Sequence, residues 1–295
     1  MNDGRTTRRR FVAGVGASVA AVTAAGCLGS DDDDDDPDGI GPKDIESRRE
    51  RMPDPDVDLE WDDAREFRAW LFDDGNETTG QYNYTEDLPP VDDVESPILE
   101  VIDGYPDRVD GLLRQPGSEV VFGEFDRDDL ESTLEGSDAY AVTDEYEGYV
   151  VAEPDDENGD GGPVAGGDDA IVVGSRYERP IDAGRGERDR LEEIDPWMTH
   201  VFETLPTGEL ASGAYLAPLE GLEHGEIYCW GVSTPDREAD ASEWALVFDD
   251  PDDAVDAEND VRSEVELVGG EVTALEVDER TMTMTVAGRQ LDEEY

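Results

Sequence analysis

The charge of the chain constrains its folding more than any other feature. Over 295 residues it carries 80 aspartates and glutamates against 22 lysines and arginines, a formal net charge of -58 at pH 7. In dilute buffer a compact domain with so many uncompensated carboxylates would repel itself strongly. At an ionic strength of about 1 M the Debye length falls to about 3 Å, which screens most of that repulsion. The composition therefore predicts a protein that folds in concentrated salt.

The strong negative charge also limits the kinds of molecule that the protein can bind. Binding to nucleic acid through a basic face is excluded, because no cluster of basic residues outweighs its acidic surroundings. The acidic residues are spread along the whole chain, so we interpret them as a solvated surface; the alternative is a surface for a cationic partner or calcium. Hydrophobic residues make up 36% of the chain, enough to build a core beneath that surface.

The first 27 residues carry the most specific motifs. Arg8, Arg9 and Phe11 form a twin-arginine export motif ahead of an apolar stretch that reaches residue 26. As a helix that stretch is about 24 Å long, shorter than the roughly 30 Å core of a bilayer. The sequence Ala-Ala-Gly before Cys27 matches a lipobox, in which the cysteine becomes the lipidated first residue. We therefore predict a cleaved signal and a lipid anchor on the outer face of the membrane; the alternative is an uncleaved anchor helix.

Four regions follow from these motifs and from the composition. Residues 1–26 form the signal peptide, and residues 27–58, which hold a run of six aspartates and several prolines, form a disordered acidic tether. Residues 59–288 form the extracytoplasmic domain, and residues 289–295 form a short tail.

Hydrophobic patterns predict an α+β domain with mostly antiparallel sheet and three to four helices. Strands are expected at 120–125, 139–143, 149–152, 170–174, 211–216, 226–232 and 244–248, with a closing hairpin at 272–277 and 281–286. Helices are expected near 63–72, after Asp126, across 180–205 with an N-cap at Asp195, and at 251–266. A strand followed by a helix at 171–193 and again at 245–266 allows two weakly related subdomains.

The export motif, the lipobox and the aspartate run together resemble the uncharacterised, twin-arginine-exported lipoproteins of haloarchaea. The segments 123–126, 147–149 and 171–174 extend this resemblance over most of the chain. The resemblance implies an exported lipoprotein whose only inherited functional residue is Cys27. It implies no catalytic activity.

Motifs for catalysis are absent from the sequence. It contains no Gly-x-Ser-x-Gly elbow, His-Glu-x-x-His helix, phosphate-binding loop or Cys-x-x-Cys pair. Its two histidines, His200 and His224, are interpreted as surface residues. Cys229 lies in an apolar run and is expected to be a buried, inert thiol.

One segment resembles the opening of a calcium loop. Asp156, Asn158 and Asp160 alternate ahead of a glycine, as such loops require, but the twelfth position is glycine and not glutamate. Asp168 and Asp169 are candidate substitutes for the missing ligand. Because aspartate is so abundant, an ordinary solvated hairpin loop remains the favoured interpretation.

Two Asn-x-Thr sequons, at Asn76 and Asn83, are candidate glycosylation sites on an exported protein. Taken together, the sequence predicts a lipid-anchored binding or accessory module of a halophile's cell envelope, with an envelope protein as a candidate partner. The alternatives are a hydrolase that uses two carboxylates and a calcium-stabilised structural surface protein.

Overall fold

The computed structural model describes residues 42–57, 59, 61, 64–73, 81–86, 108–137, 139–155, 162–215, 227–236 and 239–288. Its helices are α1 (Pro42–Arg51), the 3-10 helix η1 (Glu66–Trp70), α3 (Arg127–Glu135), α4 (Glu178–Arg185), α5 (Leu191–Ile194), α6 (Pro196–Thr204), α7 (Pro251–Asp256) and α8 (Glu258–Leu267). Its strands are β1 (Gln81–Thr85), β2 (Val109–Gln115), β3 (Ser118–Gly123), β4 (Tyr140–Tyr146), β5 (Tyr149–Pro154), β6 (Val164–Gly166), β7 (Ala170–Val173), β8 (Leu210–Tyr215), β9 (Ile227–Thr234), β10 (Ala241–Phe248), β11 (Glu271–Asp278) and β12 (Thr281–Ala287).

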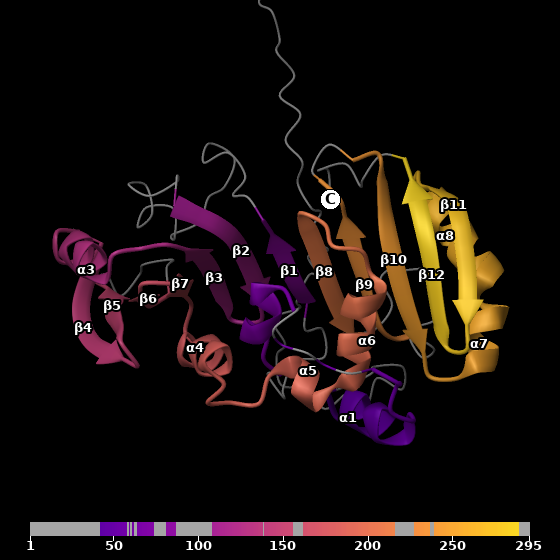
Figure 1. Ribbon diagram of the computed structural model, residues 1–295, viewed down its shortest axis with the longest axis horizontal. Helices are drawn as coiled ribbons and strands as arrows, with labels where there is room; N and C mark the ends of the chain where they lie inside the picture. The colour runs from indigo at the N-terminus through magenta and orange to yellow at the C-terminus, as the bar shows by residue number, and fades with distance from the viewer. Residues whose placement is uncertain are drawn as a thin grey trace, which may run out of the picture.

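The twelve strands form a single antiparallel sheet, which confirms the expected α+β class with mostly antiparallel pairing. The strand order is β11-β12-β10-β9-β8-β1-β2-β3-β7-β6-β5-β4, so β1 lies near the middle and joins the two halves (Figure 1). The described part of the chain contains seven α-helices, more than the three to four expected.

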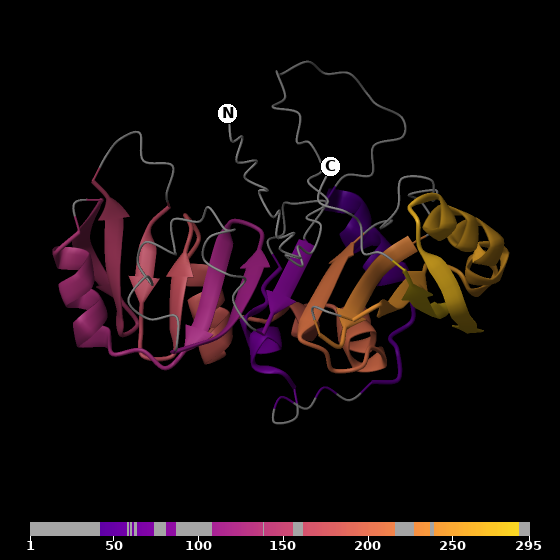
Figure 2. The same cartoon turned by 90° about the horizontal axis from the view of Figure 1, so that it is seen from above.

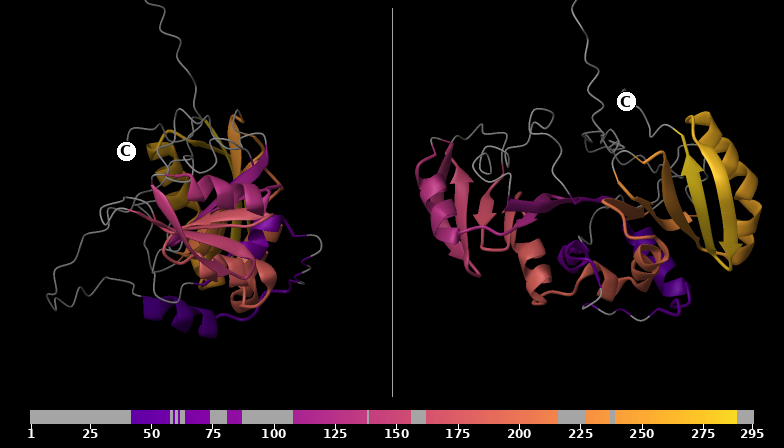
Figure 3. Two further views of the ribbon diagram at one scale, coloured as in Figure 1. Left: turned by 90° about the vertical axis from the view of Figure 1, so that its left-hand side faces the viewer. Right: turned by 45° about the horizontal axis from the view of Figure 1, so that its top comes forward.

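Helices cover both faces of the sheet. On one face η1, α4, α5 and α6 pack over the central strands, with Trp70, Ile181, Leu191 and Val201 in one buried cluster (Figure 2). On the other face α3 covers the outer strands of the first half through Leu130 and Leu134. At the opposite end of that face α7 and α8 cover β9, β10 and β12, with the predicted core methionines Met282 and Met284 beneath them (Figure 3).

Two facing glycines let α6 lie close to the sheet. Gly213 on β8 is the cross-strand partner of Gly231 on β9. A Cβ atom at Gly231 would lie 2.5 Å from a methyl group of Val201, and one at Gly213 would lie 3.1 Å from the ring of Phe202. Any side chain at Gly231 would therefore force Val201, and with it the C-terminal half of α6, away from the sheet.

In both halves of the sheet a strand leads into a helix, and the chain then returns to pair a later strand with the first. The helices that correspond between the halves are not the ones expected from the sequence. In the first half β3 leads into α3, and the chain returns to pair β7 with β3. In the second half β10 leads into α7 and α8, and the chain returns to pair β12 with β10. The expected counterpart, the helix that follows β7, is α4, which packs on the other face of the sheet. The matching of residues 171–193 with 245–266 was therefore wrong.

The structure also differs from the expected tether over residues 42–57. Residues 42–51 form α1, and Ile45 and Met52 are buried in the same cluster as the central helices. Helix α1 lies at the lower edge of the sheet in Figure 1, where β8 ends and β9 begins. The folded body therefore starts well before residue 59.

Candidate functional site: a buried cluster beneath the first helix

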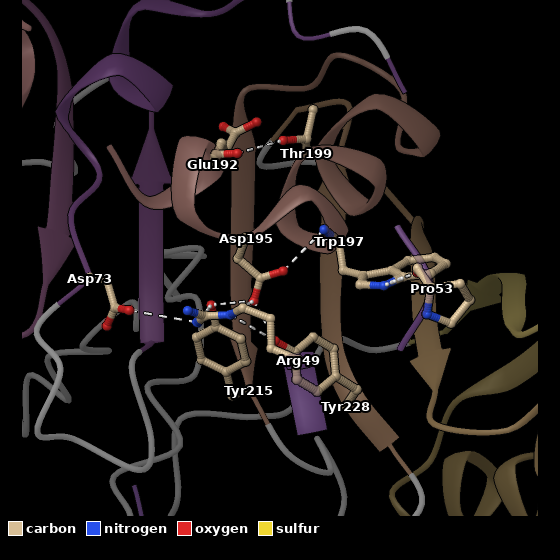
Figure 4. Close-up of polar contacts among 9 residues, drawn as sticks. All are labelled: Arg49, Pro53, Asp73, Glu192, Asp195, Trp197, Thr199, Tyr215 and Tyr228. Carbon is tan, nitrogen blue, oxygen red and sulfur yellow. Dashed lines mark hydrogen bonds and ion pairs between the residues drawn. The ribbon is translucent and has the colours of Figure 1, made fainter. Parts of the chain in front are cut away.

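Asp195 is the centre of a buried polar cluster (Figure 4). It is the N-cap of α6, where its Oδ1 accepts a hydrogen bond from the backbone N–H of Trp197 at 3.0 Å. Its Oδ2 accepts bonds from the hydroxyls of Tyr215 at 2.9 Å and Tyr228 at 2.5 Å, and from Nε of Arg49 at 3.1 Å. The residue is fully buried, so these contacts replace all of its hydration.

A β-bulge brings the two tyrosines together. Cys229 pairs with Val247 and Ile227 pairs with Phe248, which leaves Tyr228 as an extra residue on β9. The bulge turns the side chains of Tyr228 and Cys229 to the same face of the sheet, where Tyr215 lies opposite Cys229. Bulges commonly re-aim a side chain in this way next to a specialised site.

The groups around Asp195 stay protonated at neutral pH. Burial raises the pKa of Tyr215 and of Tyr228, and the charge of Asp195 raises both further. Burial and Asp195 likewise raise the pKa of the Cys229 thiol. Burial lowers the pKa of Arg49, but the tyrosines and Asp195 outweigh it and raise that pKa overall. The cluster therefore consists of one acceptor group surrounded by donors.

A second ion pair lies beside the first. The Nε atom of Arg48 lies 3.0 and 2.8 Å from the two carboxylate oxygens of Asp249, which follows β10. The Arg48 guanidinium lies 5.6 Å from the ring centre of Tyr228. Its two terminal nitrogens are buried and have no hydrogen-bond acceptor in the part of the chain that the structure describes. Arg280 donates to the backbone oxygen of the same Asp249 and so closes this end of the cluster.

A third pair joins η1 to α5. Arg68 contacts Glu192 in a two-pronged arrangement, with Nε at 2.8 Å and Nη2 at 2.5 Å from the carboxylate oxygens. Burial raises the pKa of Glu192, and the Arg68 contact opposes that rise. The hydroxyl of Thr199 donates to the backbone oxygen of Glu192 at 3.3 Å. This pair fixes α5 and α6 relative to η1.

The arrangement around Asp195 suits a structural joint better than a catalytic centre. A general base needs a free lone pair that faces the substrate, and a nucleophile needs access to it. Both oxygens of Asp195 accept hydrogen bonds from the protein, and the side chain has no exposed surface. The cluster ties the first helix to the sheet through contacts between residues more than 140 positions apart.

Most residues singled out from the sequence lie outside the described residues. These are Arg8, Arg9, Phe11, Cys27, Asn76, His224 and the calcium-loop candidates Asp156, Asn158 and Asp160. Their roles therefore stay predictions.

Asp168 and Asp169, the substitutes offered for the missing calcium ligand, have other contacts. Asp168 accepts a hydrogen bond from the backbone N–H of Arg127, and Asp169 accepts one from the hydroxyl of Tyr149 at 2.5 Å. Across the described ranges no three His, Cys, Asp or Glu side chains are grouped so that they could hold a metal ion.

Three other predicted residues lie within the described structure. Asn83 lies on the central strand β1, where its side-chain oxygen accepts a hydrogen bond from the hydroxyl of Ser212 at 2.8 Å. His200 is only half-exposed: its Nε2 lies 2.9 Å from the hydroxyl of Thr281, and burial lowers its pKa. Cys229 is fully buried.

Glu66 on η1 bears on the two-carboxylate alternative. Its side chain reaches the surface, yet partial desolvation raises its pKa, and Asp169 and Asp110 raise it further. The hydrogen bond from Tyr149 already engages Asp169. Glu66 and its acidic neighbours Asp169 and Asp110 are therefore the residues to which the two-carboxylate alternative would apply.

Sequence motifs did not predict that Arg48 and Arg49 belong to a functional or structural site, although their spacing in the sequence is unusual. The chain has few basic residues, and Arg48, Arg49 and Arg51 form their densest group after the export motif. A cationic group in so acidic a chain indicates a specific use.

Comparisons with known proteins assign no family to the chain. No protein-family model matches it, and no curated protein matches it. Crystal form III of TP0453 is similar with a TM-score of 0.43 and 10% identity, over 75% of this chain and 93% of that one. Crystal form IV of TP0453 gives a TM-score of 0.38 and 12% identity, over 75% and 92%. No helix among the described residues is long and apolar enough to span a bilayer.

Proposed function

We propose that this chain is an exported, lipid-anchored module that binds a ligand or an accessory partner on the outer face of a halophile's cell membrane. The export motif and the lipobox around Cys27 support the route and the anchor. The charge of -58 supports a protein that works in concentrated salt. A lipid is needed because so acidic a body gains nothing from anionic headgroups.

The strongest structural support for this proposal is that α1, which follows the proposed lipidation site in the sequence, is packed against the folded domain. Ile45, a buried residue of α1, lies about 18 residues after Cys27, a span of at most about 65 Å. Arg48 and Arg49 fix α1 to the sheet, so a lipid on Cys27 would hold the whole domain near the membrane. Such an arrangement suits a module that acts on partners within the envelope.

A pair of cysteine variants tests the anchor. We expect Cys27→Ser to release the protein into the medium, because the one lipid attachment site is lost. The matched control Cys229→Ser removes the other cysteine of the chain and should stay with the membrane fraction. The measurement is the distribution of the protein between membrane and medium in native salt. Membrane retention of Cys27→Ser equal to that of the control would contradict the anchor.

The export route is tested in the same assay. Replacing Arg8 and Arg9 together by lysine should hold the full-length protein in the cytoplasm, since a twin-arginine route requires both guanidinium groups. Normal export of this double variant would refute the twin-arginine part of the proposal. It would not bear on the lipid anchor, which the variants Cys27→Ser and Cys229→Ser test separately.

A further inference from the structure

The segment of residues 42–57, here called the stem, crosses the lower edge of the sheet and is held by a small set of contacts. Two apolar side chains, Ile45 and Met52, are buried. The polar contacts are the ion pairs of Arg48 and Arg49, hydrogen bonds from Arg49 to the hydroxyls of Tyr215 and Tyr228, and a bond from the Trp197 indole N–H to the backbone oxygen of Pro53 at 3.2 Å. We propose that the stem is a detachable strap, which opens while the sheet stays folded and thereby sets how far the domain reaches from its anchor.

The first argument is that α1 depends on docking for its own structure. It has 10 residues, whereas an isolated helix shorter than about 12–15 residues is marginal in water. Its sequence, PKDIESRRER, is strongly polar and contains no apolar face beyond Ile45. Detachment and unwinding of the stem would therefore occur together.

The second argument is that burying Arg48 carries a desolvation penalty. The side chain is 5% exposed, and its two terminal nitrogens are buried without an acceptor among the described residues. The guanidinium carbon lies over the ring of Tyr228, but a cation-π contact does not supply a hydrogen-bond acceptor in the plane of the N–H groups. A buried donor without a partner carries its full desolvation penalty. The stabilisation from the Arg48–Asp249 ion pair is therefore offset by this desolvation penalty. Arg49 accordingly makes the larger polar contribution to the attachment of the stem.

The third argument is that the body does not need the stem for its core. The central helices η1, α4, α5 and α6 pack on the sheet through their own buried residues. The bonds that Asp195 accepts from Trp197, Tyr215 and Tyr228 all come from the body of the domain and do not involve the stem. Regions with few apolar contacts open at lower free energy than the whole domain. The stem fits that description.

Detachment would change the reach of the domain. With the stem released, a described contact further along the chain is that of Trp61, whose indole donates to Glu193 and whose ring lies under Arg190. Trp61 lies about 34 residues after Cys27, so the maximal reach rises from about 65 Å to about 120 Å. This consequence rests on the proposed lipid anchor, whereas the detachment itself does not.

The Cys229 thiol provides the readout. It is fully buried in the same cluster as Ile45 and Met52, close enough to Arg48 and Arg49 that their charges affect its pKa. In a full-length chain carrying Cys27→Ser it is the sole cysteine. Its rate of reaction with a disulfide reagent in molar KCl then measures opening at this edge of the sheet.

We expect labelling of Cys229 to occur faster than global unfolding and to depend only weakly on denaturant, as local opening does. Arg49→Gln should raise the labelling rate by about tenfold or more, because it breaks the main polar hold. Ile45→Ala should act in the same direction and serves as a second variant if the first is poorly folded. Arg51→Gln makes the same charge change on an exposed position of α1 and should leave the rate unchanged.

Labelling that matches the rate and denaturant dependence of global unfolding in every variant would overturn the strap. So would an equal effect of Arg49→Gln and Arg51→Gln. Neither result depends on whether Cys27 carries a lipid, so the failure of this inference and the failure of the proposed function are distinguishable.

Discussion

Replacing Asp195 by alanine is expected to lower the free energy of unfolding by about 3–5 kcal/mol, the usual cost of removing one partner of a buried ion pair. The change leaves Arg49 with its more distant partner Asp73, at 3.5 Å, and leaves the buried hydroxyls of Tyr215 and Tyr228 without their acceptor. It also removes the N-cap of α6. Denaturant unfolding at neutral pH in a fixed molar concentration of KCl measures the loss.

The control for this variant is a second N-cap. Asp126 accepts a bond from the backbone N–H of Asp129 at the start of α3, and it is exposed and makes no buried ion pair. Asp126→Ala should therefore cost only about 1 kcal/mol. Equal losses for the two variants would show that Asp195 is an ordinary cap and that the cluster contributes little to stability.

Diluting the salt is expected to unfold the domain. The net charge of -58 is spread over the chain, and the Debye length grows from about 3 Å at 1 M to about 10 Å at 0.1 M. Repulsion between carboxylates then acts across neighbouring elements and destabilises the compact state. The measurement is the thermal midpoint by circular dichroism as KCl is lowered from about 3 M to about 0.1 M.

A neutral osmolyte separates charge screening from general solvent effects. Sucrose at the same water activity should not restore the midpoint in low salt, since it strengthens burial without screening charge. A midpoint that stays constant down to 0.1 M KCl would mean that the acidic residues are not an adaptation to brine.

Local rules were sufficient to predict many elements of the fold. Asp195 before Pro196 predicted the start of α6, and alternating methionines and threonines predicted β12 with Met282 and Met284 inward. The hairpin expected over residues 139–152 forms as β4 and β5, but its turn is shorter than the five residues 144–148 expected: β4 continues to Tyr146, and Glu147 and Gly148, both at positive φ, make the turn. In each of these the residues that decide the structure are close together in the sequence.

The elements that depend on distant partners were not predicted. Within helix α1 the buried apolar residue is Ile45, and Met52 follows just after the helix. The position of α1 is fixed by Arg48 and Arg49, whose partners lie 201 and 146 residues away, respectively. Strand β1 reads Gln-Tyr-Asn-Tyr-Thr, and its membership of the sheet depends on pairing with β2 and β8. No pattern within ten residues contains that information. The Asp195 cluster was missed for the same reason, because three of its members come from β8, β9 and α1.

The measurement that tests the account most directly is mass spectrometry of the mature N-terminus, on protein taken from native membranes. The account predicts that residues 1–26 are absent and that the first residue is Cys27 carrying a lipid on its sulfur. An intact terminus that begins at Met1, or an unmodified Cys27, would contradict the lipid-anchored module on which the proposed function stands.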